Sequence, residues 1–208
     1  MEENNKLIPI ANNSLVQKAT ISLAITNKLI AENNKQLVIE IFRKNPKLFL
    51  DLISEYYPLD LNFLLEFKDI LNWQLLGTNE NLPWSAEFIK NFKDKWDWKE
   101  LSRNKSLPWS IEFIEYYKDK WDWEELSINK NLPWSIEFIE KHKDKLDWWW
   151  ISINKNIPWT EDLIEKFENK WDWSFLSNNE NLPWSIEFIE KFENKWNWSL
   201  LSYNENLS

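Results

Sequence analysis

Side chains that could carry catalysis or bind a metal ion are scarce in this 208-residue sequence, which has one histidine, His142, and no cysteine. Without cysteine there is no disulfide, no thiol nucleophile and no cysteine metal site. No serine–histidine–acid set can be built around His142. Glu124 and Glu125 supply two neighbouring carboxylates, the groups that a two-carboxylate hydrolase uses. Acidic pairs at repeat positions are more simply explained as surface charge. We therefore expect that the protein is not an enzyme and that it has no catalytic residue, no metal site and no cofactor.

The elements that position these side chains follow from a repeat of 25 residues. Its most regular mark is a Pro-Trp pair, and the five prolines are Pro83, Pro108, Pro133, Pro158 and Pro183. A diverged first copy begins at Pro58. Self-similarity at a fixed period is the signature of a solenoid or a related array. The sequence predicts two parts: an N-terminal helical cap or docking segment, 1–57, and six tandem Trp-rich repeats, 58–208. The repeats are 58–82, 83–107, 108–132, 133–157, 158–182 and 183–207.

Each repeat carries two signals for the start of a helix. A residue with a short side-chain oxygen follows each Pro-Trp pair, and such residues cap helix N-termini. We assign structural caps for a first helix of about ten residues to Ser85, Ser110, Ser135, Thr160 and Ser185. Caps for a second, short helix, such as 98–103, are assigned to Asp97, Asp122, Asp147 and Asp172. Glu100 and Glu125, three residues after their caps, are expected to complete capping boxes.

The repeat turns almost without glycine, since the chain contains one. An asparagine follows each short helix, and asparagine tolerates the left-handed conformation at a helix C-terminus better than other non-glycine residues. We expect that conformation at Asn104, Asn129, Asn154, Asn179 and Asn204. The predicted fold is an all-α solenoid of six helix-turn-helix repeats with an N-terminal helical cap. The alternative is a leucine-rich-repeat-like α/β solenoid, in which Trp121-Asp122-Trp123 would begin a strand.

Tryptophan is unusually abundant, with 17 residues, of which only Trp149 and Trp150 lie off the repeat phase. Short helices supply few core positions, and large rings compensate because each buries a large apolar area. We expect a packing role for the repeated tryptophans. The structural core is assigned to Trp84, Trp98, Trp109, Trp123, Trp134, Trp148, Trp159, Trp173, Trp184 and Trp198. His142 replaces an aromatic residue of other repeats, such as Phe92 or Phe167, and is expected to be a packed ring.

Residues 1–57 lack the repeat period. Apolar spacing predicts one amphipathic helix over 14–32 and two more over 36–44 and 47–57, separated at Asn45-Pro46. The first six residues are polar and acidic, unlike a secretory signal. No apolar stretch approaches the about 20 residues that cross a bilayer. We expect a cytoplasmic protein that does not bind membranes.

The repeat motif Pro-Trp-Ser-Ile-Glu-Phe-Ile-Glu, then Trp-Asp-Trp, then Leu-Ser-x-Asn, resembles Trp-rich repeats of long, mostly uncharacterised bacterial proteins. The resemblance covers residues 58–208. The segment Ile25-Thr26-Asn27-Lys28-Leu29 is similar to a short N-terminal segment that precedes effector or repeat domains in bacteria. Together these resemblances imply a modular bacterial scaffold, and they supply no catalytic residue.

Positions that break the repeat pattern are the candidates for binding. Trp149 occupies a column that otherwise holds polar residues, and Ile153 lies one helical turn further along. Ile128 is the equivalent of Ile153 one repeat earlier. We hypothesise that the three form an apolar patch that binds a protein, with Trp149 as the anchor. The opposing interpretation is that Trp149 packs locally against a neighbouring loop.

The predicted function is that of a non-enzymatic repeat scaffold mediating protein–protein interaction. The alternative is a ligand-binding module that stacks a glycan or nucleotide on exposed tryptophans. A net charge of −9 argues against a nucleic-acid partner. Solenoids usually end in a polar capping repeat, and none follows the sixth repeat here, so we also expect self-association through that repeat.

Overall fold

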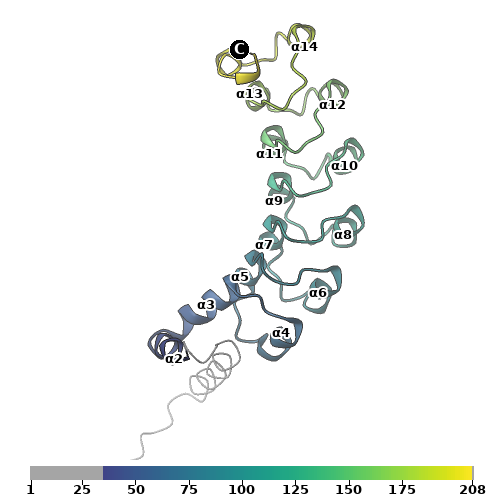
Figure 1. Cartoon of the computed structure of the whole chain (residues 1–208). Coiled ribbons are helices and arrows are strands. Elements are labelled where there is room, and N and C mark those ends of the chain that lie inside the picture. Colours follow the sequence, from purple (N-terminus) through teal and green to yellow (C-terminus); the bar gives the residue numbers. More distant parts are fainter. Residues whose placement is uncertain (1–34, 208) are drawn as a thin grey trace, which may run out of the picture. The chain divides into compact units, whose positions relative to one another are not determined.

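The computed structural model describes residues 35–207, and over that range the chain forms fourteen α-helices, one 3₁₀ turn and no strand (Figure 1). The all-α repeat solenoid predicted from the sequence is therefore confirmed. The leucine-rich alternative is wrong, because the segment expected to start a strand instead caps and begins helix α9 (Trp123–Ile128). The helix predicted over 14–32 lies outside the described residues.

Two helices precede the repeats, as predicted. They are α2 (Lys35–Lys44) and α3 (Pro46–Tyr56), and they pack against each other. Asn45 separates them because its side chain caps α3, accepting a hydrogen bond from the Leu48 N–H at 3.1 Å. Pro46 occupies the first turn of α3, where its missing N–H has no helical partner to lose.

Each repeat folds into two short helices joined by turns. The first helices of the six repeats are α4 (Leu61–Phe67), α6 (Ala86–Asn91), α8 (Ile111–Tyr116), α10 (Ile136–His142), α12 (Glu161–Lys166) and α14 (Ile186–Lys191). The second helices are α5 (Trp73–Thr78), α7 (Trp98–Arg103), α9, α11 (Trp148–Ile153), α13 (Trp173–Ser177) and α15 (Trp198–Leu201). A 3₁₀ turn, η2 (Glu205–Leu207), follows α15. The described chain forms two compact units, one ending at Pro83 and one beginning at Trp84.

The first helices have six or seven residues rather than the predicted ten. In the second repeat the helix ends at Asn91, and the next residue, Phe92, leaves the helical region with a φ of −130° while its ring is buried in the core. The Lys95 N–H then bonds the Phe92 carbonyl at 2.8 Å and closes a turn.

The predicted caps all occupy N-cap positions. Ser110 accepts from the Phe113 N–H at 3.1 Å, and Asp122 accepts from the Glu125 N–H at 3.1 Å. The same geometry occurs at Ser85, Ser135, Thr160, Ser185, Asp97, Asp147 and Asp172. The capping box expected at Glu125 is wrong. The Asp122 N–H instead donates to Ser102 Oγ of the preceding repeat at 3.0 Å, and the Glu125 carboxylate pairs with cations described below.

The left-handed conformation expected at the repeated asparagines is wrong at three of them. Asn104, Asn129 and Asn154 have φ of −66°, −68° and −74°, which is extended backbone. Their side chains explain why asparagine is needed. Asn129 is buried, its Nδ2 donates to the Ser102 carbonyl of the preceding repeat at 2.9 Å, and its Oδ1 accepts from the Asn131 N–H at 2.9 Å. The amide therefore ties neighbouring repeats together.

Candidate functional site

The second helices of the repeats provide a continuous row in the unit that begins at Trp84. The five helices α7, α9, α11, α13 and α15 pack in four successive pairs (Figure 1). The first helices of the same repeats lie in a separate row (Figure 1). Because every second helix starts at an equivalent cap, equivalent side chains from successive repeats line up along the row.

A charged cluster lies where α7 meets α9. Glu125 is buried, and both oxygens of its carboxylate accept hydrogen bonds from the Arg103 guanidinium. Lys99 Nζ lies 3.4 Å from Glu125 Oε1. The hydrogen bonds from Arg103 outweigh the effect of burial and lower the pKa of Glu125. Bidentate pairing of this kind stabilises a carboxylate away from water, so Glu125 stays ionised.

An aromatic cluster follows on α11 and α13. Trp149 is 42% exposed. Its ring centroid lies 4.1 Å from that of Trp150 and 4.8 Å from that of Phe175, and both neighbours meet it edge-on. Phe175 belongs to α13, so the ring of Trp149 bridges two repeats. The indole is held in one orientation while almost half of its surface faces solvent.

The two isoleucines of the predicted patch are both partly buried. Ile153 lies one turn beyond Trp149 on α11, as the spacing predicts. Ile128 lies on α9 and lines a cavity of about 320 Å³ together with Arg103 and Glu125. The structure thus adds Phe175 from the following repeat to the surroundings of Trp149 and places Ile128 beside the charged cluster. Sequence spacing identified Trp149 but missed Phe175, whose column also holds Glu100 and Glu125.

The tryptophans assigned to the core differ in burial. Trp159 is buried, and a partly buried group comprises Trp84, Trp98, Trp109, Trp123, Trp134, Trp148, Trp173 and Trp184. The assignment of Trp198 is wrong, because this side chain is 57% exposed. Its equivalent Trp148 packs against Phe167 and Trp171 of the following repeat, with centroids 5.1 and 4.7 Å away. Among the described residues no such pair of rings covers Trp198.

The most deeply buried indoles form a column that the core assignment omitted. They are Trp96, Trp121, Trp171 and Trp196, each 5% exposed. Trp121 lies between Trp98 of the preceding repeat, 4.9 Å away, and Trp109 of its own repeat, 5.1 Å away. The sequence signal for this column is that all six repeats have a large apolar residue there, with leucine replacing tryptophan at Leu71 and Leu146.

His142 is a packed ring at the end of α10, as expected. It is buried, and its ring lies 4.6 Å from Trp123 and 4.7 Å from Phe138. Its Nε2 lies 2.8 Å from Glu115 Oε1. Burial lowers the pKa of His142 more strongly than the nearby Glu115 carboxylate raises it. Over residues 35–207, no three histidine, aspartate or glutamate side chains come together as a metal site requires.

Fold and surface together define an all-α repeat solenoid with a charged and an aromatic cluster on one row of helices. In comparisons with known proteins, no family model, curated protein or solved structure matches the chain. Within the part of the chain that the structure describes, no helix has the length and apolar character needed to span a membrane.

Proposed function

We propose that this chain is a non-enzymatic scaffold that binds a partner protein through the outward surface of α9, α11 and α13. One observation carries the proposal: Trp149 packs edge-on against Trp150 and Phe175 yet remains 42% exposed. A large, pre-oriented aromatic side chain is a typical anchor of a protein interface, because little conformational entropy is lost when it is covered.

The neighbouring charged cluster supports a protein partner. Arg103 and Lys99 are about half exposed while the carboxylate between them is buried, so the cations present hydrogen-bond donors beside the apolar surface. Protein interfaces commonly combine an apolar centre with such a polar rim. Ile128 lines the cavity beside Arg103 and Glu125, so one isoleucine of the predicted patch lies next to the charged cluster.

Stacking of a glycan or nucleotide receives less support from the arrangement of the indoles. In the repeats, indole rings pack on each other across helices and donate their N–H groups to backbone carbonyls. Trp149 meets Trp150 and Phe175 edge-on, whereas stacking platforms present the faces of several successive rings.

The test uses the variants Trp149→Ala and Ile153→Ser in the full chain. Both should keep the circular dichroism of the wild type, because the two side chains are exposed or partly buried. Partner proteins recovered by cross-linking and mass spectrometry from the native host should be lost at least about tenfold, the loss expected for an interface anchor.

Ser174→Ala is the matched control, since Ser174 is exposed in the same column as Trp149 on the next helix. It should recover the same partners as the wild type. If both patch variants also recover them fully, this surface is not the interface.

A further inference from the structure

Salt bridges join the first helices of successive repeats at equivalent places. Glu115 of α8 pairs with Lys141 of α10 at 2.8 Å, and Glu140 of α10 pairs with Lys166 of α12 at 2.7 Å. Lys191 of α14 pairs with Glu165 of α12 at 2.8 Å. We call each of these Glu–Lys pairs a clasp. Because the first helices are less closely packed than the second ones, a clasp closes the space between two of them.

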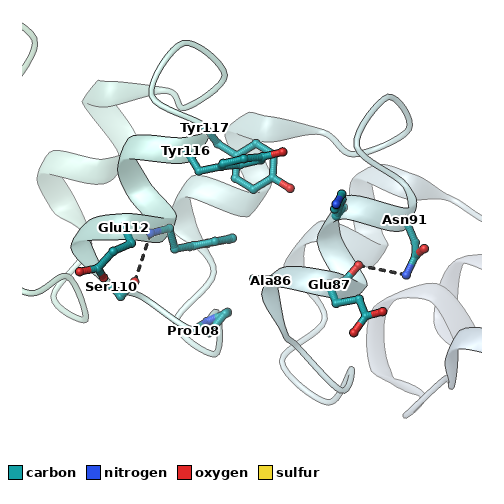
Figure 2. A pocket seen from close by; sticks show the side chains of 10 residues that line it. Ala86, Glu87, Asn91, Pro108, Ser110, Glu112, Tyr116 and Tyr117 are labelled. Carbon is teal, nitrogen blue, oxygen red and sulfur yellow. Dashed lines mark hydrogen bonds between the residues drawn. The ribbon is translucent and has the colours of Figure 1, made fainter.

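The clasp is absent between α6 and α8. Lys90 occupies the glutamate position on α6, and Tyr116 occupies the lysine position on α8. Among the described residues no carboxylate forms a salt bridge with Lys90. A groove of about 1060 Å³ opens here instead, and its walls are mainly apolar, including Pro108 and Phe113 (Figure 2).

Tyr116 and Tyr117 shape one end of this groove. Figure 2 shows both rings projecting from α8 toward α6, with their hydroxyl groups at the tips. Tyr116 is 70% exposed, and its ring meets the buried ring of Tyr117 edge-on at 4.6 Å. Lys90 lines the same groove in the last turn of α6. An ammonium group and two phenol hydroxyls therefore offer hydrogen-bond donors at the C-terminal end of the groove.

Hydrogen-bond acceptors lie at the other end of the groove. Glu87 and Glu112 are in the first turns of α6 and α8, which run in the same direction because they are equivalent helices of successive repeats. Glu112 is engaged locally, since hydrogen bonds from its own backbone N–H and from Ser110 lower its pKa. The Asn91 amide is also engaged, donating to the Glu87 carbonyl at 3.0 Å (Figure 2). Lys90 is thus a charged group of the groove that forms no salt bridge with any described carboxylate.

We propose that the groove between α6 and α8 binds a peptide segment of a partner protein, with an acidic side chain on Lys90 and an apolar side chain against Tyr116. The carboxylate of the peptide supplies the negative partner that Lys90 does not find on α8. Charge complementarity is local: Lys90 is the cation that lines the groove, and the carboxylates Glu87 and Glu112 lie at the other end, so an acidic side chain fits at the Lys90 end. The groove lies on the first helices, so this site is separate from the surface around Trp149.

The experiment selects displayed random hexapeptides on the full-length chain. Selected peptides should share one Glu or Asp next to a Leu, Ile or Phe. A selected peptide should bind at least about tenfold more tightly than its analogue with Gln or Asn at the acidic position, as expected for a charged pair that is partly shielded from water. Binding should weaken as salt is added.

The decisive variant is Lys90→Glu combined with Tyr116→Lys, which rebuilds the clasp seen at the three other places. It should keep the wild-type circular dichroism and lose peptide binding at least about tenfold. Conversely, Glu140→Lys with Lys166→Tyr should open the equivalent groove between α10 and α12 and raise the peptide stoichiometry from one to two.

The proposal is overturned if selection yields no acidic consensus, if the amide analogue binds equally well, or if the rebuilt clasp leaves affinity unchanged. Trp149→Ala provides the control that separates the two proposals. It should not affect peptide binding here, even if it abolishes capture of the partner at α9, α11 and α13.

Discussion

The indole N–H distinguishes tryptophan from the other aromatic side chains at most of its positions in this chain. Trp121 donates to the Ile114 carbonyl at 3.0 Å, Trp123 to the Lys118 carbonyl at 3.1 Å, and Trp134 to the Asn129 carbonyl at 3.0 Å. Each acceptor lies at or just beyond the end of a helix, where carbonyls lack a helical partner. Phenylalanine would fill the space and leave these carbonyls unsatisfied, so the repeat requires indole rings where its short helices end.

His142 makes stability depend on pH at the residue scale. Burial lowers its pKa, so the folded state favours the neutral ring, while the unfolded chain protonates near the ordinary value of about 6.5. Stability is therefore fully present above that value and is lost as the pH falls below it. The groups facing the ring include Glu115, whose own lowered pKa places its titration at more acidic pH, and the cations Lys141 and Lys145.

The variant His142→Phe should remove this dependence, because phenylalanine occupies the same column in four other repeats. Urea unfolding of the wild type should show a midpoint that falls between about pH 7 and pH 5, whereas the midpoint of the variant should change less. Equal slopes for the two proteins would show that the pKa of His142 is the same in the folded and unfolded states.

At the scale of the element, helices are joined across repeats by a hydrogen bond from backbone to side chain. Ser127 Oγ donates to the Trp123 carbonyl at 2.7 Å and accepts from the Asp147 N–H of the next repeat at 2.9 Å. Ser102, Ser152 and Ser177 do the same for their neighbours. In the first unit, Ser54 of α3 accepts a hydrogen bond from the Asn72 N–H at 3.1 Å. Helix α3 therefore makes the same contact with the start of α5 that the second helix of a repeat makes with the next repeat.

Replacing Ser127 by alanine should destabilise the protein by about 1–3 kcal/mol, the cost of leaving a buried N–H without a partner. The effect is measured as a shift in the urea unfolding midpoint. Ser199→Ala, at an exposed position of α15, should change stability by less than about 0.5 kcal/mol. Similar effects of the two substitutions would contradict the role assigned to the serine column.

At the scale of the whole molecule, the inter-repeat contacts are nearly the same from one repeat to the next, which makes the period itself a structural unit. Removing residues 108–132 deletes one complete repeat and brings Asp147 to Ser102 in the register that Asp122 now occupies. The shortened protein should retain its helicity per residue by circular dichroism and unfold at a lower urea concentration.

Deletion of half a period, residues 108–119, is the control for that experiment. It shifts the cap of the next helix out of register with Ser102 and should abolish cooperative unfolding. If the half-period deletion is tolerated as well as the whole-period deletion, the repeat contacts do not define the fold.

Helix positions in this chain could be predicted from local sequence because each depends on a cap and a short apolar pattern. Ser110, Asp122 and their equivalents mark helix starts that the structure places at the same residues. Helix ends were less predictable, since the first helices stop early where a ring such as Phe92 turns into the core. The backbone conformation predicted for Asn129 was wrong for a similar reason: its side-chain amide donates a hydrogen bond to a carbonyl of the preceding repeat, which local sequence does not reveal.

Local sequence thus determines the class of fold, the number of repeats and the starts of their helices, since capping and apolar periodicity act within a few residues. Burial of individual indoles and the shape of the surface depend on contacts about one period away. Trp121 is buried by Trp98 of the preceding repeat, and Trp149 is oriented by Phe175 of the following one. The groove beside Tyr116 lies between two helices from successive repeats, where the clasp between later pairs of first helices is missing. These features arise only when repeats are stacked, because a side chain is covered or exposed by partners that its own segment does not contain.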